Sequence, residues 1–195
     1  MDEKKEPKVE DIRAAAKARG CRVQQALYYV AGFLEGPMCG RCFPCSLGSF
    51  EAKRRLENIA GGRGAEADLI ALKRIAGNML EASMCKKGKD TARFLLEWLE
   101  TEAFRSHIEG RCPEGECAAL LEYRVVPAEC TMCGLCLAAC RHGAILGEQR
   151  KPFLSGYLPF EIRQKRCVKC GDCLPVCPEG AIEVVVAAEP AKVGD

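Results

Sequence analysis

The chain carries little net charge and no long apolar run, and both absences limit what it can do. Its formal net charge is +2, so no basic field points to nucleic acid or to an anionic membrane as a partner. No apolar stretch approaches the roughly 20 residues that a membrane-spanning helix needs. The opening residues, MDEKKEPKVED, lack the apolar core of a signal peptide. We therefore expect no membrane insertion, no nucleic-acid partner and no export.

No arrangement of residues suggests a catalytic acid, base or nucleophile. The glycine-rich stretch Gly61–Gly64 is the nearest approach to a phosphate-binding loop, but no strand precedes it and the G-x-G-x-x-G spacing is missing. We interpret it as a turn between two helices. No substrate chemistry is expected in this chain.

What the sequence has in abundance is cysteine, with 15 residues, and eight of them form two near-copies of one motif. CTMCGLCLAACRHGAI begins at Cys130, and CVKCGDCLPVCPEGAI begins at Cys167. Bacterial-type ferredoxins hold two 4Fe-4S clusters with this C-x2-C-x2-C-x3-C run, and the fourth cysteine of each run serves the other cluster. The motif therefore predicts two crossed ligand sets, here called set 2 (Cys130, Cys133, Cys136 and Cys177) and set 3 (Cys140, Cys167, Cys170 and Cys173).

Other uses of these cysteines fit less well. Zinc ribbons use paired C-x2-C knuckles, without a third cysteine at the same spacing and a fourth after three residues. A disulfide scaffold belongs to exported proteins, and cysteines packed this closely would pair with awkward geometry. Reduced, iron-loaded cysteines predict a cytoplasmic protein, or one on a soluble face of a larger complex.

The part of the chain before these repeats has helical periodicity. Val23, Leu27, Val30 and Leu34 share one helix face, and Gly36-Pro37 ends that helix. Further helices are predicted over 47–60, 66–82 and 90–107, the last with Asp90 as its N-cap. Short strands are predicted at Tyr123–Val126 and Ala181–Val186.

These elements predict a small helical bundle carrying one 4Fe-4S cluster, followed by an α+β two-cluster ferredoxin-like module. The expected segments are a disordered tail over 1–11, a helical iron–sulfur domain over 12–110, a junction over 111–121, a two-cluster ferredoxin domain over 122–187 and a tail over 188–195.

The cluster of the helical half is predicted from a third cysteine motif. PMCGRCFPC places three cysteines at C-x2-C-x2-C, and SMCKKG supplies a fourth, giving set 1 (Cys39, Cys42, Cys45 and Cys85). Backbone N–H groups of a helix that starts near Ser46 would stabilise the negatively charged cluster. A radical-SAM loop would need C-x3-C-x2-C, which is missing, and structural zinc is the alternative for the same cysteines.

Three segments of the helical half resemble a known family: CGRCFPCSLG, DLIALKRIAGNMLEASMCKKG and FRSHIEGRCPEGEC. They are similar to the C-terminal iron–sulfur region of the NADH-binding flavoprotein subunit of complex I. The resemblance is greater to the extended form in soluble NAD-linked and electron-bifurcating hydrogenases, where a two-cluster ferredoxin follows. It covers about residues 25–187, and it implies that set 1 holds the flavin-proximal cluster. The flavin- and NADH-binding domain that precedes this region in those subunits is absent, so no flavin or NAD is expected in this chain.

The sequence departs from that family at three places. Pro37-Met38 stand where the family usually has Glu-Ser before the first cysteine, and Ser46 stands where it has Arg after the third. In the first ferredoxin repeat Arg141-His142 follow the fourth cysteine, where proline is customary, while the second repeat keeps Pro178. None of these changes removes a predicted ligand.

Three cysteines remain, and two of them form an H-x4-C-x4-C pattern with a histidine. His107, Cys112 and Cys117 are candidate zinc ligands, and the fourth ligand is left open between Cys21, His142 and a partner protein. The alternative is that Cys112 and Cys117 are small buried apolar residues. Cys21 is expected in the middle of a helix as a free thiol.

The sequence thus predicts an electron-transfer subunit of a cytoplasmic, NAD(P)-linked oxidoreductase complex, a class that includes electron-bifurcating complexes, with three 4Fe-4S clusters. It would work between a flavin/NAD(P)-binding subunit and either soluble ferredoxin or a metal-containing catalytic subunit. The alternatives are a free-standing diffusible polyferredoxin and a zinc-dependent structural scaffold. The terminal substrate stays open between hydrogen, formate, an aldehyde and a thioester.

Overall fold

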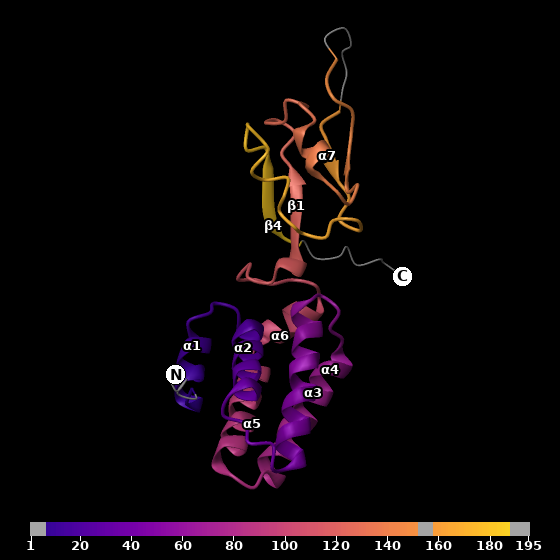
Figure 1. Ribbon diagram of the computed structural model, residues 1–195. Helices are drawn as coiled ribbons and strands as arrows, with labels where there is room; N and C mark the ends of the chain where they lie inside the picture. The colour runs from indigo at the N-terminus through magenta and orange to yellow at the C-terminus, as the bar shows by residue number, and fades with distance from the viewer. Residues whose placement is uncertain (1–6, 152–157, 188–195) are drawn as a thin grey trace, which may run out of the picture. The chain divides into compact units, whose positions relative to one another are not determined.

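The structure is a computed structural model that describes residues 7–151 and 158–187. The described residues divide into two compact units, one extending to Leu120 and the other spanning Leu121–Ala187. The first unit is built of helices, whereas the second contains short strands and long loops (Figure 1). The predicted junction 111–121 lies in the first unit except for its last residue. The predicted tail 188–195 lies outside the described residues.

The helical unit is held together by α2, which contacts α1, α3, α5 and α6. Its largest fully buried side chains include Tyr29, Phe33, Leu56 and Leu72, and aromatic Trp98 lies against Tyr29 with ring centroids 5.4 Å apart. Burying these apolar groups is the main stabilising term for the bundle. Its elements are α1 (Val9–Lys17), α2 (Arg22–Glu35), α3 (Phe43–Ala60), α4 (Glu66–Ala82), α5 (Lys86–Leu99), α6 (Glu102–Ile108) and the short η1 (Ala118–Leu120).

The N-terminal helix begins earlier than the sequence pattern predicts. Residues 9–11 of the predicted disordered tail belong to α1, and residues 1–6 lie outside the described part. Two features start the helix there: the backbone N–H of Lys8 donates to the Asp11 carboxylate at 3.3 Å, and Val9 packs its buried side chain beside Ile12. A carboxylate in the first turn satisfies backbone donors that a helix start leaves unpaired.

The predicted single helix over 90–107 was wrong, because two helices cover this stretch. Thr101 interrupts them: its hydroxyl donates to the carbonyl of Trp98 at 2.7 Å, and its backbone is extended where it N-caps α6. The N-cap of α5 is Cys85 and not Asp90, so α5 begins directly after a cysteine of set 1. Similarly, α3 begins at Phe43, with Cys42 as its N-cap, four residues before the predicted start.

The second unit pairs the two strands near its ends. β1 (Leu121–Val125) runs antiparallel to β4 (Ile182–Val186), with Tyr123 opposite Val184, and β2 (Ile145–Leu146) pairs with β3 (Glu161–Ile162). A short helix, α7 (Leu135–Ala139), lies between β1 and β2 in the chain. The small core includes Phe160 and Ile162, and cysteines of sets 2 and 3 pack against it. No helix among the described residues of either unit is long and apolar enough to cross a membrane.

Candidate metal centres

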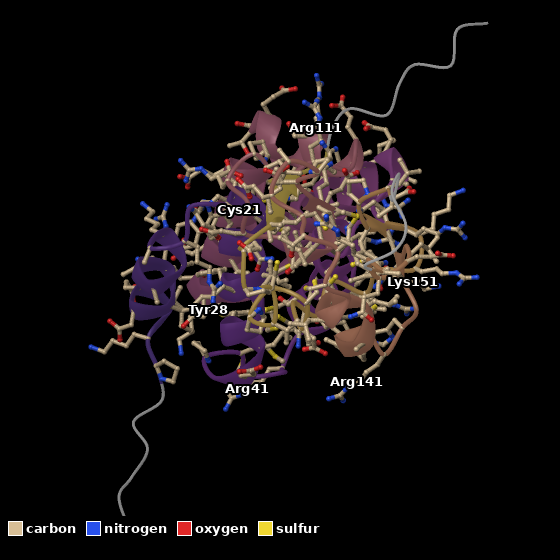
Figure 2. All side chains as sticks on the ribbon, turned by 90° about the horizontal axis from the view of Figure 1, so that it is seen from above. Cys21, Tyr28, Arg41, Arg111, Arg141 and Lys151 are labelled. Atoms are coloured by element: carbon tan, nitrogen blue, oxygen red, sulfur yellow. The ribbon has the colours of Figure 1, made fainter. Side chains whose placement is uncertain are left out.

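Set 1 lies where two helices begin. Cys42 is the N-cap of α3 and Cys85 is the N-cap of α5, and neither cap residue makes a side-chain hydrogen bond to its helix. The first-turn N–H groups of α5, and those of Phe43 and Cys45 in α3, where Pro44 has none, can therefore act on a negatively charged group held between these thiols. Cys39 and Cys85 are exposed, whereas Cys45 is buried in the first turn of α3. Arg41, between the first two cysteines, projects outward (Figure 2).

The thiols of set 1 lie close enough to influence one another. Burial and, to a smaller extent, charge repulsion from the neighbouring thiols of Cys42, Cys85 and Cys39 raise the pKa of Cys45 to about 11. A buried thiol that resists deprotonation beside three others is suited to a cation, because metal binding releases its proton and neutralises the repulsion. The donor chemistry of four cysteines fits a 4Fe-4S cluster or zinc.

The two cysteine repeats of the second unit share the same tight turn. Met132 and Lys169 occupy equivalent positions and both have left-handed backbones, with φ of 57° and 61°. The backbones of Gly134 and Gly171, two residues further on, are also left-handed in both repeats, with φ of 81° and 82°. A left-handed residue in a two-residue spacer turns the chain sharply, and this repeated turn aims neighbouring sulfur atoms at one centre.

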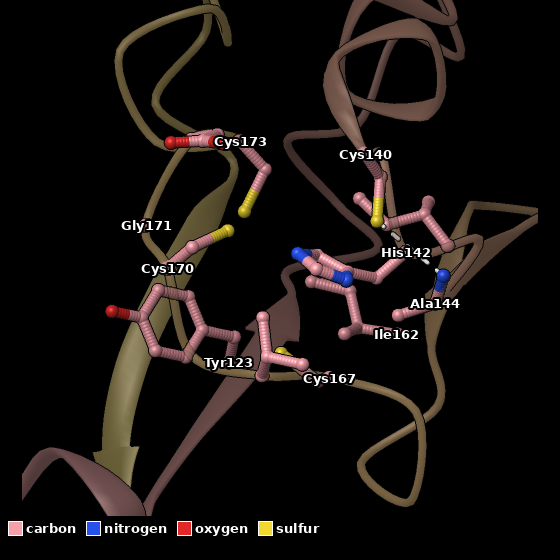
Figure 3. Close-up of a pocket in the computed structure, with 12 residues that line it drawn as sticks. Tyr123, Cys140, His142, Ala144, Ile162, Cys167, Cys170, Gly171 and Cys173 are labelled. Atoms are coloured by element: carbon pink, nitrogen blue, oxygen red, sulfur yellow. Dashed lines mark hydrogen bonds between the residues drawn. The ribbon is translucent and has the colours of Figure 1, made fainter.

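The eight cysteines of this unit line two separate pockets. One pocket is lined by all four cysteines of set 2, together with the buried Phe160 and Ala181. The other is lined by all four of set 3, with Tyr123 and Ile162 (Figure 3). In each pocket, three cysteines come from one repeat and the fourth from the other, which is the crossed arrangement that the spacing predicts.

The thiol of Cys140 differs from the other thiols around it. Burial would raise its pKa, but backbone N–H groups of residues 142–145 outweigh that effect and hold the pKa below its ordinary value. One of them, the N–H of Ala144, donates to the sulfur at 3.3 Å (Figure 3). Burial raises the pKa of Cys173, in the same pocket, to about 11. Arg141, where the customary proline is missing, projects outward (Figure 2). The exposed His142 lines this pocket (Figure 3).

A fourth group of ligand atoms lies buried inside the helical unit. Cys21, His107, Cys112 and Cys117 are all buried, and their potential ligand atoms lie within 4.8 Å of one another. We call these four residues the Cys3His group. They come from the N-cap of α2, from α6 and from the loop that follows α6.

Three ligand atoms of the Cys3His group lie at distances that fit a tetrahedral zinc site. Sγ of Cys21 and Sγ of Cys117 are 3.9 Å apart, and each lies 3.3 Å from Nε2 of His107. A Zn–S bond of about 2.3 Å places the sulfur atoms of an ideal tetrahedron about 3.8 Å apart. The other ring nitrogen of His107, Nδ1, lies 2.6 Å from the carbonyl oxygen of Ala103. Donation from Nδ1 to that carbonyl leaves Nε2 free as a ligand, as in most zinc-bound histidines.

Without a metal, this group is unfavourable. The hydrogen bond from Cys117 and burial raise the pKa of Cys21 to about 12, and burial also raises that of Cys112. Two of the three thiols, those of Cys21 and Cys112, therefore favour the protonated form beside the imidazole. A divalent cation would replace those protons and bond to all four atoms.

Comparison with known proteins identifies the iron–sulfur regions. Residues 25–111 match the NADH-ubiquinone oxidoreductase-F iron-sulfur binding region. Residues 129–181 match the 4Fe-4S dicluster domain. The chain is an F-type iron–sulfur region followed by a 4Fe-4S dicluster domain. These matches support 4Fe-4S clusters as cofactors and confirm the resemblance that the cysteine motifs suggested.

The relatives are subunits of larger oxidoreductases. The NADP-reducing hydrogenase subunit HndC of Solidesulfovibrio fructosivorans is 33% identical over 135 residues, 68% of this chain and 27% of the relative. The NADP(+)-dependent formate dehydrogenase subunit beta of Moorella thermoacetica is 38% identical over 93 residues, 46% of this chain and 13% of the relative. The F subunit of the NADH-quinone oxidoreductase of Streptomyces coelicolor is 36% identical over 78 residues, 38% of this chain and 17% of the relative. The chain therefore matches less than a third of the length of each.

Sequence reasoning missed the place of Cys21 in the helical unit. Cys21 does not lie in the middle of a helix, as expected, because Gly20 precedes it in non-helical backbone and Cys21 N-caps α2. Of the candidate fourth ligands, the structure brings Cys21 to the Cys3His group, while His142 lines the pocket of set 3. The only signal in the sequence was that Cys21 had no other assigned role.

The crossed ligand sets of the dicluster domain make a direct prediction. In the Cys140→Ser variant, we expect the cluster held with Cys167 to be lost or damaged and the cluster held by Cys130 to be retained, because serine is a poor ligand for iron at that position. The Cys177→Ser variant is the matched control and should show the reverse pattern. Electron paramagnetic resonance of the reduced proteins separates the two signals. Loss of the Cys130 signal in Cys140→Ser would show that the ligands are not crossed.

Proposed function

We propose that this chain is an electron-transfer subunit of a cytoplasmic, multi-subunit NAD(P)-linked oxidoreductase. It would stand between a flavin-containing subunit and either ferredoxin or a metal-containing catalytic subunit, and an electron-bifurcating complex is included in this class. Each 4Fe-4S cluster, when bound, accepts and gives up one electron at a time. The observation that carries the proposal is the presence of three complete sets of four cysteines within one F-type region and one dicluster domain.

The residues around the three sets fit such clusters. Each set offers four thiols, and sets 2 and 3 each surround a small pocket walled by apolar side chains. Set 1 adds two helix N-termini, and set 3 adds backbone N–H donors around Cys140. Such donors stabilise a negatively charged cluster and raise its reduction potential. In this proposal the protein ligates the clusters, shields them and adjusts their potentials.

We also propose that the Cys3His group binds one structural zinc ion. A fully ligated tetrahedral zinc has no open position for a substrate, and zinc carries no redox electrons. Its role would be to fix the start of α2 against α6 and the loop over 112–117. The proposal rests on the distances within the group and on the buried thiols that have few other partners.

A partner subunit is supported by exposed apolar side chains beside set 1. Phe43, Leu47 and Phe50 lie four and three residues apart along α3, so they share one helix face. Phe43 is 83% exposed, as is Met84, which directly precedes Cys85. Apolar side chains gathered on a surface mark an interaction site more often than a solvated face. A diffusible polyferredoxin would leave this surface in water, so we favour a docked flavin subunit.

The proposal that a flavin subunit donates electrons to this chain is tested with the iron-loaded chain and the flavoprotein that co-purifies with it. NADH should leave the visible absorbance of the clusters unchanged in the chain alone and should bleach it after the flavoprotein is added. Leu47→Glu should strongly slow bleaching by NADH, because a buried charge weakens docking, while reduction by dithionite stays normal.

The control for this test is Ile70→Glu. Ile70 is 63% exposed near the start of α4, whereas set 1 lies beyond the other end of that helix. This variant should be reduced at the normal rate. Reduction of the lone chain by NADH, or no reduction in the presence of the flavoprotein, would contradict the proposed function.

A further inference from the structure

Two buried hydroxyl groups in the helical unit have no hydrogen-bond partner. Ser49 on α3 is 1% exposed, and Ser83, which follows α4, is 3% exposed. Among the described residues, neither side-chain oxygen meets a partner in hydrogen-bond geometry. Burying an unpaired hydroxyl costs free energy, and most buried polar groups in folded proteins are paired. An acceptor supplied by a bound group would remove this cost.

Ser49 lies next to the buried cysteine of set 1. It follows Cys45 by four residues on α3, so both side chains lie on one face. Although burial raises the pKa of Cys45, the nearby Ser49 hydroxyl acts in the opposite direction, as a donor to the thiolate would. A helical serine often donates to the carbonyl four residues earlier. Ser46 does so, to the carbonyl of Cys42 at 3.2 Å, whereas Ser49 does not.

Ser83 approaches the same cysteine from another helix end. A Cβ atom placed on Gly88 would lie 2.9 Å from Oγ of Ser83 and 3.1 Å from Sγ of Cys45. The hydroxyl and the thiol therefore border the same small space, which the glycine on α5 keeps open. Two unpaired donors, one on α3 and one after α4, therefore lie near Cys45, the first on the same helix face and the second beside the same small space.

We propose that Ser49 and Ser83 are positioning residues that donate hydrogen bonds to the sulfur of Cys45, or to a sulfide beside it, when set 1 holds its cluster. This inference rests on the proposed function. Reduction adds a negative charge, and a hydrogen bond to a charged acceptor is stronger than one to a neutral acceptor. The two hydroxyls therefore stabilise the reduced form and raise the reduction potential at set 1.

The test is a redox titration of the iron-loaded Ser49→Ala/Ser83→Ala double variant, followed by electron paramagnetic resonance. Iron content should match that of the unchanged protein. The equilibrium constant for reduction at set 1 should fall about tenfold, which is about 59 mV for a one-electron couple. The potentials at sets 2 and 3 should not change, and they serve as an internal control. The signal of set 1 is identified as the one that a Cys85→Ser variant loses.

Two further variants separate hydrogen bonding from packing. Ser46→Ala is the matched control, because the Ser46 hydroxyl already donates to a backbone carbonyl. The reduction potential at set 1 should stay unchanged in this variant. Ser83→Thr should keep the original potential, because it keeps the hydroxyl and the extended backbone there, with φ of −70° and ψ of 135°, suits threonine. If the double variant takes up too little iron, the single alanine variants serve instead. Each should lower the equilibrium constant for reduction at set 1 by about threefold.

The outcomes distinguish this inference from the proposed function. Full iron content with an unchanged potential in the alanine variants would overturn the role of the two hydroxyls and leave the cluster at set 1 in place. The same conclusion follows if Ser83→Thr shifts the potential as far as Ser83→Ala. An unchanged protein that binds zinc and no iron at set 1 would instead overturn the proposed function.

Discussion

Replacing Cys21 with alanine is expected to abolish zinc binding and to destabilise the helical unit. The side chain is fully buried and contributes one of four ligand atoms to the Cys3His group. Structural zinc contributes on the order of 10 kcal/mol or more to the folding of small zinc-binding peptides. Even partial loss, about 3 kcal/mol, should lower the melting temperature by about 10 °C in a unit of this size. Metal analysis and thermal denaturation of iron-loaded protein measure both effects.

The matched control is Val23→Ala, on the same helix. Val23 is as fully buried as Cys21, but it offers no ligand atom. This variant should lose only packing, of the order of 1–3 kcal/mol, and keep one zinc ion per chain. Zinc retained in Cys21→Ala would remove Cys21 from the site. Iron-loaded protein without any zinc would show that the four residues are plain buried side chains.

The Cys85→Ser variant should lose one whole cluster. With three clusters, the unchanged chain should hold about twelve iron atoms, and the variant about eight. Cys85 belongs to the helical unit, whereas sets 2 and 3 belong to the second unit, so the dicluster domain should keep its spectrum. The variant should also accept no electrons from the flavoprotein if set 1 is the docking site. Iron analysis and electron paramagnetic resonance after dithionite reduction give the answer.

The neighbouring Met84→Ser variant controls for local disturbance. Met84 is exposed and offers no thiolate, so this variant should keep about twelve iron atoms. If the unchanged protein instead holds about eight iron atoms, with zinc in place of the missing four, set 1 is a zinc site. Zinc in place of all the iron would instead support a structural scaffold.

Local spacing carried most of the information in this sequence. Three ligands of each iron–sulfur motif fall within one tight loop, so their chemistry is visible without a structure. The F-type and dicluster matches confirm the families that this spacing suggested. The helix over 66–82 was also correctly predicted, because a glycine-rich turn precedes it and Asp68 accepts the backbone N–H of Ala65 at 2.9 Å in its first turn.

Features that depend on distant contacts could not be predicted in this way. Cys21 lies 86 residues from His107 in the chain, and only the packing of α2 against α6 brings them together. The break at Thr101 was hidden because the apolar pattern continues through it, while a side-chain hydrogen bond ends α5. The small space shared by Ser83 and Cys45 depends on a glycine on a third helix.

The long separation between Cys21 and Cys117, 96 residues, also bears on the unfolded chain. A metal ion bound to both would close almost the entire helical unit into a single ring. An unfolded chain that kept the ion would lose about 4 to 5 kcal/mol in chain entropy for a ring of this length, so the ion binds the folded unit far more tightly. The ring would hold the two ends of the bundle together while α3 and α5 open locally. An iron–sulfur cluster could then be inserted between those helix ends without passing through an unfolded chain.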